Sequence, residues 1–220
     1  MPGRTIAIGD IHGCSAALDA LIDAIRPRPQ DTIITLGDYI DRGPDSRGVI
    51  DRLVELGRVC RLVPILGNHD QMLLDVRSGK YPIYWFLDIG GTATLDSYGP
   101  GRDLANIPEA HFDFIQKCLD FFETNSHIFL HANYFADLPM TDQPVCMLRW
   151  ESLRDALPGP HDSGKTVVVG HTSQKNGEIF DLGHLKCIDT FCYGGGWLTA
   201  LDVLTGEVWQ ADREGNLRSS

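Results

Sequence analysis

Short apolar runs that end in glycine and a polar residue recur at nearly constant spacing in the first 70 residues of this 220-residue chain. The runs lie at residues 6–8, 33–36 and 63–66. They lead into Asp10, Asp38 and Asn68, which are 28 and 30 positions apart, close to the length of one strand–helix–strand unit. Right-handed crossovers would make the three strands parallel and place these polar residues at one edge of the sheet, where ligands bind in open α/β sheets.

Helical patterns fill the intervals between the runs. Apolar residues between Leu18 and Ile25 repeat at i, i+3, i+4 and i+7, and prolines follow them. A second stripe extends from Ile50 to Gly57, with Asp45 or Ser46 as its N-cap. The alternation of strand and helix predicts an α/β fold.

The rest of the chain is less regular. Residues 110–123 are apolar on nearly all sides and are predicted to form a buried helix. Strands are predicted at 128–130 and 167–169, and shorter, antiparallel strands in the tail. The tail strands are expected at residues 185–189, 197–204 and 208–209. Because no linker interrupts the chain, we expect residues 1–220 to form a single domain.

The chain is acidic, with 30 Asp and Glu against 19 Lys and Arg and a net charge of −11. This charge argues against a nucleic-acid partner, which would require a basic face. It is compatible with an anionic substrate, because bound divalent metals reverse the local charge. The six cysteines are scattered, and the sequence has neither a signal peptide nor a long apolar run. We therefore expect a cytoplasmic protein without a membrane partner.

Five polar clusters follow the predicted strands. They are D-I-H at 10–12, G-D-Y-I-D-R-G at 37–43, G-N-H-D at 67–70, H-A-N at 131–133 and G-H-T at 170–172. Asp10 or Asp38 alone could be a helix N-cap, and a lone histidine is usually a packed or surface residue. Five clusters of carboxylate, imidazole and amide groups at strand ends together indicate a site for a metal such as Mn, Fe or Zn.

The motifs D-x-H-G, G-D-x-x-D-R-G and G-N-H-[DE], in this order and spacing, resemble those of the calcineurin-like metallophosphoesterases. Within them, the sequence is most similar to the small bacterial and phage members of the phosphoprotein phosphatase family. Residues 67–72 and 85–91, Ile188 to Thr190, and Leu198-Thr199 extend the likeness over nearly the whole chain. The resemblance implies central mixed β-sheets flanked by helices.

The resemblance also implies two divalent metal ions. Manganese is the expected metal, and iron, zinc and cobalt are the alternatives. The implied ligands are Asp10 and His12 for the first ion, Asp38 as the bridge, and Asn68, His131 and His171 for the second ion. A metal pair about 3.5–4 Å apart would ionise a shared water to hydroxide for in-line attack on phosphorus.

Three further residues are assigned catalytic roles by the resemblance. His69 would protonate the leaving alkoxide, and Asp41 would keep its imidazole protonated and oriented. Arg42 would bind phosphate oxygens through its planar guanidinium, and Asn68 is also expected to contact the substrate.

A second phosphate-binding arginine is implied two residues after a tryptophan, and here the chain departs from the family pattern. Trp150 is followed two residues later by Ser152, while arginines occupy positions 149 and 154. We expect Arg149 to be the second phosphate ligand, with Arg154 as the alternative.

The sequence thus predicts a metal-dependent phosphomonoesterase that acts on phosphoserine or phosphothreonine in proteins or peptides, with phosphotyrosine as a further substrate. The alternative is a hydrolase like the symmetrical bis(5′-nucleosyl)-tetraphosphatases, although the chain is compact and lacks a large insertion to hold nucleotides. A phosphodiesterase or nuclease is disfavoured, because Gly170-His171-Thr172-Ser173 lacks the second histidine of G-H-x-H. A non-catalytic binding module would need a broken ligand set, and no ligand is missing. The oligomeric state is left open.

Overall fold

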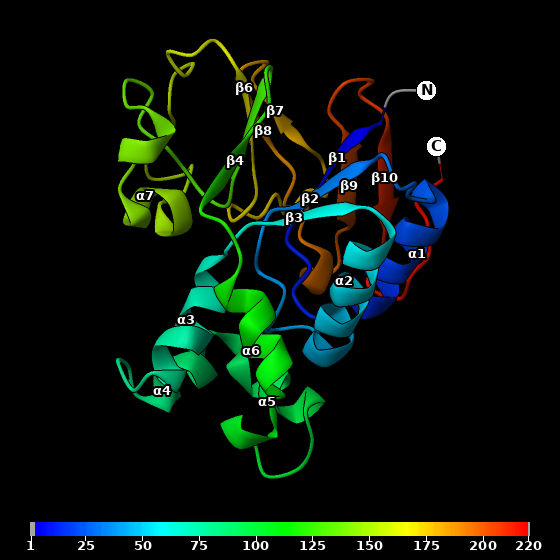
Figure 1. The fold of residues 1–220 in the computed structure, drawn as a ribbon, viewed down its shortest axis with the longest axis vertical. Coiled ribbons are helices and arrows are strands. Elements are labelled where there is room, and N and C mark those ends of the chain that lie inside the picture. The colour runs from blue at the N-terminus through cyan, green and yellow to red at the C-terminus, as the bar shows by residue number, and fades with distance from the viewer. Residues whose placement is uncertain (1–2, 220) are drawn as a thin grey trace.

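Two five-stranded sheets pack against each other at the centre of the computed structural model, which describes residues 3–219 (Figure 1). The first sheet has the order β10-β9-β1-β2-β3. Its strands are β1 (Thr5–Ile8), β2 (Thr32–Thr35), β3 (Arg61–Pro64), β9 (Leu198–Asp202) and β10 (Val208–Ala211). β1, β2 and β3 are parallel, as predicted, and β9 runs antiparallel to both β1 and β10.

The second sheet has the order β4-β5-β6-β8-β7. Its strands are β4 (Phe121–Glu123), β5 (His127–Leu130), β6 (Thr166–Val169), β7 (Phe180–Asp181) and β8 (Leu185–Cys187). The three inner strands are parallel, and the two edge strands are antiparallel to their neighbours. Both sheets are therefore mixed, and each has a parallel centre.

Helices cover the outer sides of the sheets, with α3 to α6 grouped below them and α7 beside the second sheet in Figure 1. The α-helices are α1 (Ser15–Ile25), α2 (Ser46–Val59), α3 (Asn68–Arg77), α4 (Ile83–Phe86), α5 (Thr92–Ser97), α6 (Glu109–Gln116) and α7 (Val145–Trp150). Shorter turns are the π-helical η1 (Leu87–Gly91) and the 3₁₀ turns η2 (Leu104–Asn106), η3 (Met140–Asp142) and η4 (Cys192–Gly194). The side chain of Asp45 accepts the Gly48 N–H at 2.8 Å, so Asp45 is the N-cap of α2.

The core lies in layers because successive side chains of a strand point to opposite faces. Ile6 and Ile8 of β1 pack under the helices, whereas Ala7 between them faces the second sheet. Phe129 of β5 and Val168 of β6 meet Ala7 in this inter-sheet core, and all five side chains are fully buried. The inter-sheet core therefore fixes the position of one sheet on the other.

The helix predicted over residues 110–123 is wrong in its second half. α6 ends at Gln116, and the two phenylalanines at 121 and 122 belong to β4, which pairs with β5. Between them, the N–H of Leu119 donates to the carbonyl of Pro64 at 2.8 Å. Pairing with β5 and the hydrogen bond to Pro64 outweigh the local helical pattern here, and aromatic residues suit strands.

The tail forms short strands as predicted, but one of them pairs differently. β9 and β10 are antiparallel, whereas β8 runs parallel to β6. The antiparallel prediction for β8 is wrong because β7 lies between β6 and β8 in the chain and reverses its direction.

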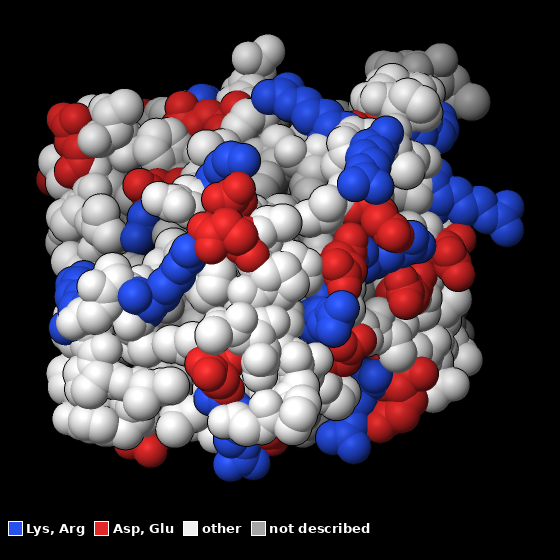
Figure 2. All heavy atoms as spheres, turned by 60° about the horizontal axis from the view of Figure 1, so that its bottom comes forward, with Lys and Arg blue, Asp and Glu red and all other residues white. Residues whose placement is uncertain are grey.

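Charges of both signs are interspersed on the face shown in Figure 2. Ion pairs on the surface of the molecule include Arg77 with Glu109 and Arg102 with Asp96. Across residues 3–219, no helix has the length and apolar character needed to cross a membrane.

A buried ion cluster joins the start of the first sheet to the end of α1. Asp31 is fully buried, and its carboxylate accepts hydrogen bonds from Arg4 at 2.6 Å and from Arg28 at 2.9 Å. Burial acts to raise the pKa of Asp31, but the hydrogen bonds from Arg28 and Arg4 outweigh burial and lower it. The cluster therefore stabilises the fold when Asp31 is ionised.

We predict that Asp31→Asn lowers the free energy of unfolding by about 2 kcal/mol at pH 7, because the buried carboxylate loses its charge and the two partly exposed guanidinium groups of Arg4 and Arg28 lose their counter-ion. The folded-state pKa is the lower one, so this contribution is complete above the unfolded value of about 3.9 and is lost as the pH falls below it. Urea unfolding of both proteins at pH 7, 5 and 3 should show a difference that shrinks only at pH 3.

Asp23→Asn is the matched control, because Asp23 is exposed and lies 4.0 Å from Arg52. It should change stability by less than about 1 kcal/mol. A difference for Asp31→Asn that stays constant down to pH 3 would contradict the prediction.

Candidate active site

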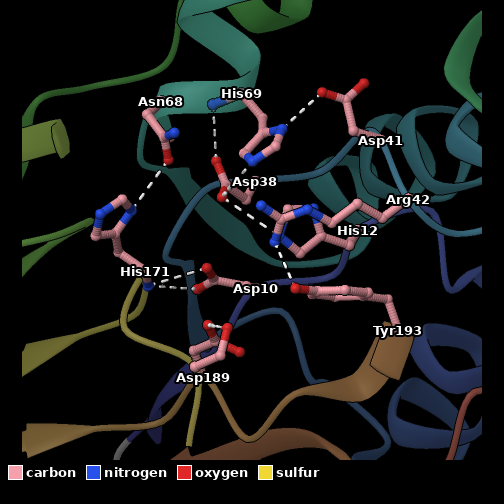
Figure 3. Close-up of polar contacts among 12 residues, drawn as sticks. Asp10, His12, Asp38, Asp41, Arg42, Asn68, His69, His171, Asp189 and Tyr193 are labelled. Atoms are coloured by element: carbon pink, nitrogen blue, oxygen red, sulfur yellow. Dashed lines mark hydrogen bonds and ion pairs between the residues drawn. The ribbon is translucent and has the colours of Figure 1, made fainter. Parts of the chain in front are cut away.

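Side chains from both sheets converge where the parallel strands end (Figure 3). Asp10 and His12 follow β1, Asp38, Asp41 and Arg42 follow β2, Asn68 and His69 follow β3, His131 follows β5, and His171 follows β6. The carboxylates and imidazoles are buried, apart from the half-buried His171, and Arg42 is exposed. The structure thus gathers residues that are up to 161 positions apart, as in the contact between Asp10 and His171.

The loops that carry these residues adopt an unusual backbone conformation. Within residues 3–219, eight residues other than glycine have a positive φ, and five of them belong to this site. These five are His12 (45°), Asp38 (49°), Asp41 (72°), Arg42 (68°) and His171 (61°). Left-handed backbone is costly for such residues and is found mainly where function and surrounding contacts require it.

Two glycines allow the loops to approach one another. A Cβ on Gly170 would lie 1.9 Å from a carboxylate oxygen of Asp10. Gly37 has a φ of 100°, and a Cβ there would lie 2.6 Å from the backbone nitrogen of Gly67. Any larger side chain at either position would push two site loops apart.

Asp38 lies between two groups of potential metal ligands. His12 and His69 form one group with it, and His131 and His171 form the other, with the ligand atoms of each group within 4.8 Å of one another. The Nε2 atom of His12 is 3.4 Å from Oδ2 of Asp38, and the Nε2 atom of His131 is 3.5 Å from its Oδ1. The two oxygens of Asp38 therefore face different groups, as a bridging carboxylate requires.

Backbone carbonyls fix which imidazole nitrogens are free to bind a metal. Nδ1 of His12 bonds to the carbonyl of Ile40 at 2.9 Å, Nδ1 of His131 to that of Leu36 at 2.7 Å, and Nε2 of His171 to that of Trp150 at 3.0 Å. A carbonyl only accepts, so each of these nitrogens carries the proton and the other ring nitrogen presents its lone pair to the site. A hydrogen bond from the far ring nitrogen to a backbone carbonyl is typical of metal-binding histidines.

Acceptor atoms face one another at the second group. Oδ1 of Asn68 is 3.0 Å from both Nε2 of His131 and Nδ1 of His171, and these nitrogens are 3.2 Å apart. The carbonyl bonds described above leave both nitrogens without a proton, so three lone pairs point at one place. A cation satisfies such a set, and the residues present therefore fit a divalent metal.

Burial keeps two of these histidines neutral. It lowers the pKa of His12 to about 3 and that of His171 to about 4. Burial, together with the carboxylates of Asp189 and Asp38, raises the pKa of Asp10. Neutral imidazoles and crowded carboxylates are the state in which a cation binds most favourably.

His69 has the opposite electrostatic setting. Its Nδ1 is 2.7 Å from Oδ2 of Asp41, and its Nε2 is 4.0 Å from Asp38. Burial acts to lower the pKa of His69, but the negative charges of Asp38 and Asp41 outweigh burial and raise it. These charges favour the protonated form of the imidazole, and its Nε2 is directed toward the ligand cluster (Figure 3).

Arg42 is held beside the cluster by a residue that the sequence patterns missed. Its Nη1 donates to the hydroxyl of Tyr193 at 2.8 Å and is 3.2 Å from Nε2 of His12. The guanidinium also lies 4.6 Å from the centre of the Tyr193 ring (Figure 3). Tyr193 is 151 positions from Arg42 and lies outside every motif, so only the folded chain reveals the contact.

The two candidates for the second phosphate ligand have other partners. Arg149 donates to the carboxylate of Asp120, and Arg154 donates to the carbonyl of Ser173. Among residues 3–219, neither guanidinium makes a hydrogen bond with the ligand cluster. The role of Arg149 stays a prediction.

A family model described as calcineurin-like phosphoesterase matches residues 3–205. The chain belongs to the calcineurin-like phosphoesterase family. This confirms the family predicted from the motifs and the fold class of mixed sheets flanked by helices. Phosphoesterase hydrolysis with divalent metal ions is the chemistry of this family, and the His and Asp groups above are the candidate ligands.

Relatives of this calcineurin-like phosphoesterase fall into two kinds. Serine/threonine-protein phosphatase 1 of Salmonella typhimurium (strain LT2) is 30% identical over 200 residues, which cover 87% of this chain and 88% of that protein. A symmetrical bis(5′-nucleosyl)-tetraphosphatase of Erwinia tasmaniensis is 46% identical over 76 residues, which cover 34% of this chain and 27% of that protein.

Solved structures also share the fold of this chain. One provisionally assigned as a diadenosine tetraphosphatase has a TM-score of 0.72 and 25% identity, covering 96% of this chain and 95% of its own. A cold-active protein-tyrosine phosphatase of a psychrophilic Shewanella has a TM-score of 0.60 and 16% identity, covering 99% of this chain and 80% of its own, and supports the fold alone.

We predict that Asp38→Asn abolishes binding of a metal pair to this phosphoesterase, because Asp38 is the carboxylate that the two ligand groups share. Metal content after dialysis against Mn²⁺, measured by plasma mass spectrometry, should fall from about two ions per chain to one or none. The control is Asp137→Asn, the same change at an exposed carboxylate, which should retain both ions. Two tightly held ions in Asp38→Asn would refute the bridging assignment.

Proposed function

We propose that the chain is a metal-dependent phosphomonoesterase that removes phosphate from phosphoserine or phosphothreonine in proteins or peptides. The observation that carries this proposal is the match to serine/threonine-protein phosphatase 1, which covers 87% of this chain and 88% of that protein. Among the curated relatives, this alignment spans nearly the whole of both proteins, whereas that to the Erwinia tasmaniensis tetraphosphatase spans 34% of this chain.

The proposed ligands are Asp10 and His12 on one side of Asp38, and Asn68, His131 and His171 on the other. When bound, two divalent ions would ionise a water and neutralise charge on the phosphate. Manganese suits the mixture of carboxylate, amide and imidazole groups, as do iron, zinc and cobalt. The histidines contribute ligand atoms whose directions are set by hydrogen bonds to the carbonyls of Ile40, Leu36 and Trp150.

His69 is the proposed general acid. Asp41 holds its Nδ1–H, so the proton on Nε2 is the one available to a leaving alkoxide. Alkoxides are strong bases, and the alcohols of serine and threonine are poor leaving groups without protonation. The negative charges of Asp38 and Asp41 outweigh burial and raise the pKa of His69, which favours the protonated form that a general acid requires.

Arg42 is the proposed phosphate ligand among the arginines. Its guanidinium lies at the exposed border of the cluster, where the hydroxyl and ring of Tyr193 hold it. A planar donor fork at this position can bind two phosphate oxygens while the ester lies over the ligand groups. Asn68 is proposed as a second contact to the phosphate, and Arg149 as a third that would have to leave Asp120.

A symmetrical dinucleoside tetraphosphatase is the second candidate. It is favoured by the 46% identity to the Erwinia tasmaniensis enzyme, although the match spans 27% of that protein, and by the TM-score of 0.72 to the provisional diadenosine tetraphosphatase. The same ligand groups would serve an anhydride, whose leaving group is a nucleoside diphosphate. We further propose a cytoplasmic protein without nucleic-acid or membrane partners.

We predict that phosphoserine and phosphothreonine peptides are hydrolysed with a kcat/KM at least about tenfold above that for diadenosine tetraphosphate. Phosphate released from the peptides and nucleoside diphosphate released from the dinucleotide would be measured in Mn²⁺ buffer, with a phosphotyrosine peptide in parallel. The Asp38→Asn variant is the control: activity that it retains on either substrate does not come from the candidate site. Faster release of nucleoside diphosphate would replace the proposed function by its alternative.

We predict that His69→Asn lowers kcat on a phosphoserine peptide by about 10²–10⁴-fold, because it removes the acid for the alkoxide. The loss should be much smaller on p-nitrophenyl phosphate, whose leaving group is a weak base, and the metal content should stay near two ions. His184→Asn, at a half-buried histidine outside the site, is the control. An equal loss on both esters would argue against the acid role.

A further inference from the structure

The carboxylate of Asp41 is held from two sides. Oδ2 accepts the hydrogen bond of His69, and Oδ1 accepts one from the hydroxyl of Thr94 at 2.6 Å. Thr94 lies in α5, 53 positions from Asp41, and is fully buried. Each oxygen of the carboxylate therefore has a side-chain donor, and the two donors come from different helices.

The direction of these hydrogen bonds follows from what each group can donate. An ionised carboxylate only accepts, so the single hydroxyl proton of Thr94 points to Asp41. The hydroxyl of Ser46, 3.0 Å away and also fully buried, then donates to Thr94. The backbone N–H of Asp41 completes the network by donating to Thr94 at 2.8 Å and to Ser46 at 3.1 Å. The hydroxyl hydrogen bonds therefore point in one direction: Ser46 donates to Thr94, and Thr94 donates to Asp41.

This use of a helical threonine is unusual. The hydroxyl of a threonine in a helix commonly donates a hydrogen bond to the backbone carbonyl three or four residues earlier. Here the carbonyl of Gly90, four residues before Thr94, accepts the N–H of Arg42 at 3.2 Å instead. The start of α5 and the turn before it therefore hold both Asp41 and Arg42, two residues with left-handed backbone.

We propose that Thr94 is a positioning residue for the proposed general acid, and that it acts through Asp41 on His69. The inference rests on the proposed acid role of His69. With its Oδ1 bound to Thr94, the carboxylate cannot rotate, so Oδ2 stays in the plane where it meets Nδ1 of His69. Without Thr94, a buried carboxylate oxygen would lack its side-chain donor, and the imidazole would lose its fixed orientation.

The test compares Thr94→Val with Thr94→Ser, since valine keeps the shape and serine keeps the hydroxyl. Thr94→Val should lower kcat on a phosphoserine peptide by about 10- to 100-fold, the effect of one hydrogen bond to a charged group. On p-nitrophenyl phosphate the loss should be smaller, with KM and metal content unchanged, and Thr94→Ser should restore most of the activity. Thr92→Val is the control, because Thr92 lies in the same helix and its hydroxyl makes no hydrogen bond among residues 3–219.

A double variant shows whether Thr94 acts through His69. If it does, Thr94→Val should cause little further loss in the His69→Asn background. Equal losses on both esters, or full additivity with His69→Asn, would overturn the proposal. If Thr94→Val does not fold, Ser46→Ala probes the same network from its other end, and the loss should again be larger on the phosphoserine peptide.

The same data separate this inference from the proposed function. A His69→Asn variant with a selective loss on the alkyl ester, beside a Thr94→Val variant without one, overturns the role of Thr94 and leaves the acid in place. A His69→Asn variant without any selective loss removes the acid role itself, and the role of Thr94 with it.

Discussion

The arrangement of the site depends on a concentration of buried acceptors around Asp38. Three histidines donate a ring N–H to backbone carbonyls on the far side, so their other ring nitrogens and the carboxylates face one another. In a buried setting this is unfavourable unless a positive charge is present. The sheets and loops hold these acceptor groups together despite their mutual repulsion, and a bound cation would offset the unfavourable free energy.

Holding the groups in place requires a second set of buried contacts. Asp70 illustrates this, because its carboxylate accepts the backbone N–H groups of Asp38, Tyr39 and Gly67. These bonds join the loop after β2 to the start of α3 and support the left-handed backbone of Asp38. Ser46 and Thr94 do the same for Asp41. The strained conformations at the site therefore persist because neighbouring polar groups determine them.

The sequence was sufficient for the parts of this molecule that follow from local pattern. Apolar runs ending at Asp10 and Asp38 predicted the parallel strands, and the motifs predicted which side chains the loops would bring together. Contacts between segments far apart were not predictable, because Thr94 and Tyr193 look like ordinary residues of a helix and a turn. The missed strand β4 has a different cause: its apolar residues also fit a helical pattern, and its pairing with the following strand β5 decides its conformation.

The ligands belong to two different sheets, and this has a mechanical consequence. Asp38 extends from the first sheet and His131 from the second, joined across the boundary by the bond from His131 to the carbonyl of Leu36. The spacing between the two halves of the centre is thus set by how Ala7, Phe129 and Val168 interlock beneath it. The distance between the candidate ligands of the two sheets therefore depends on the thickness of the hydrophobic core between the sheets.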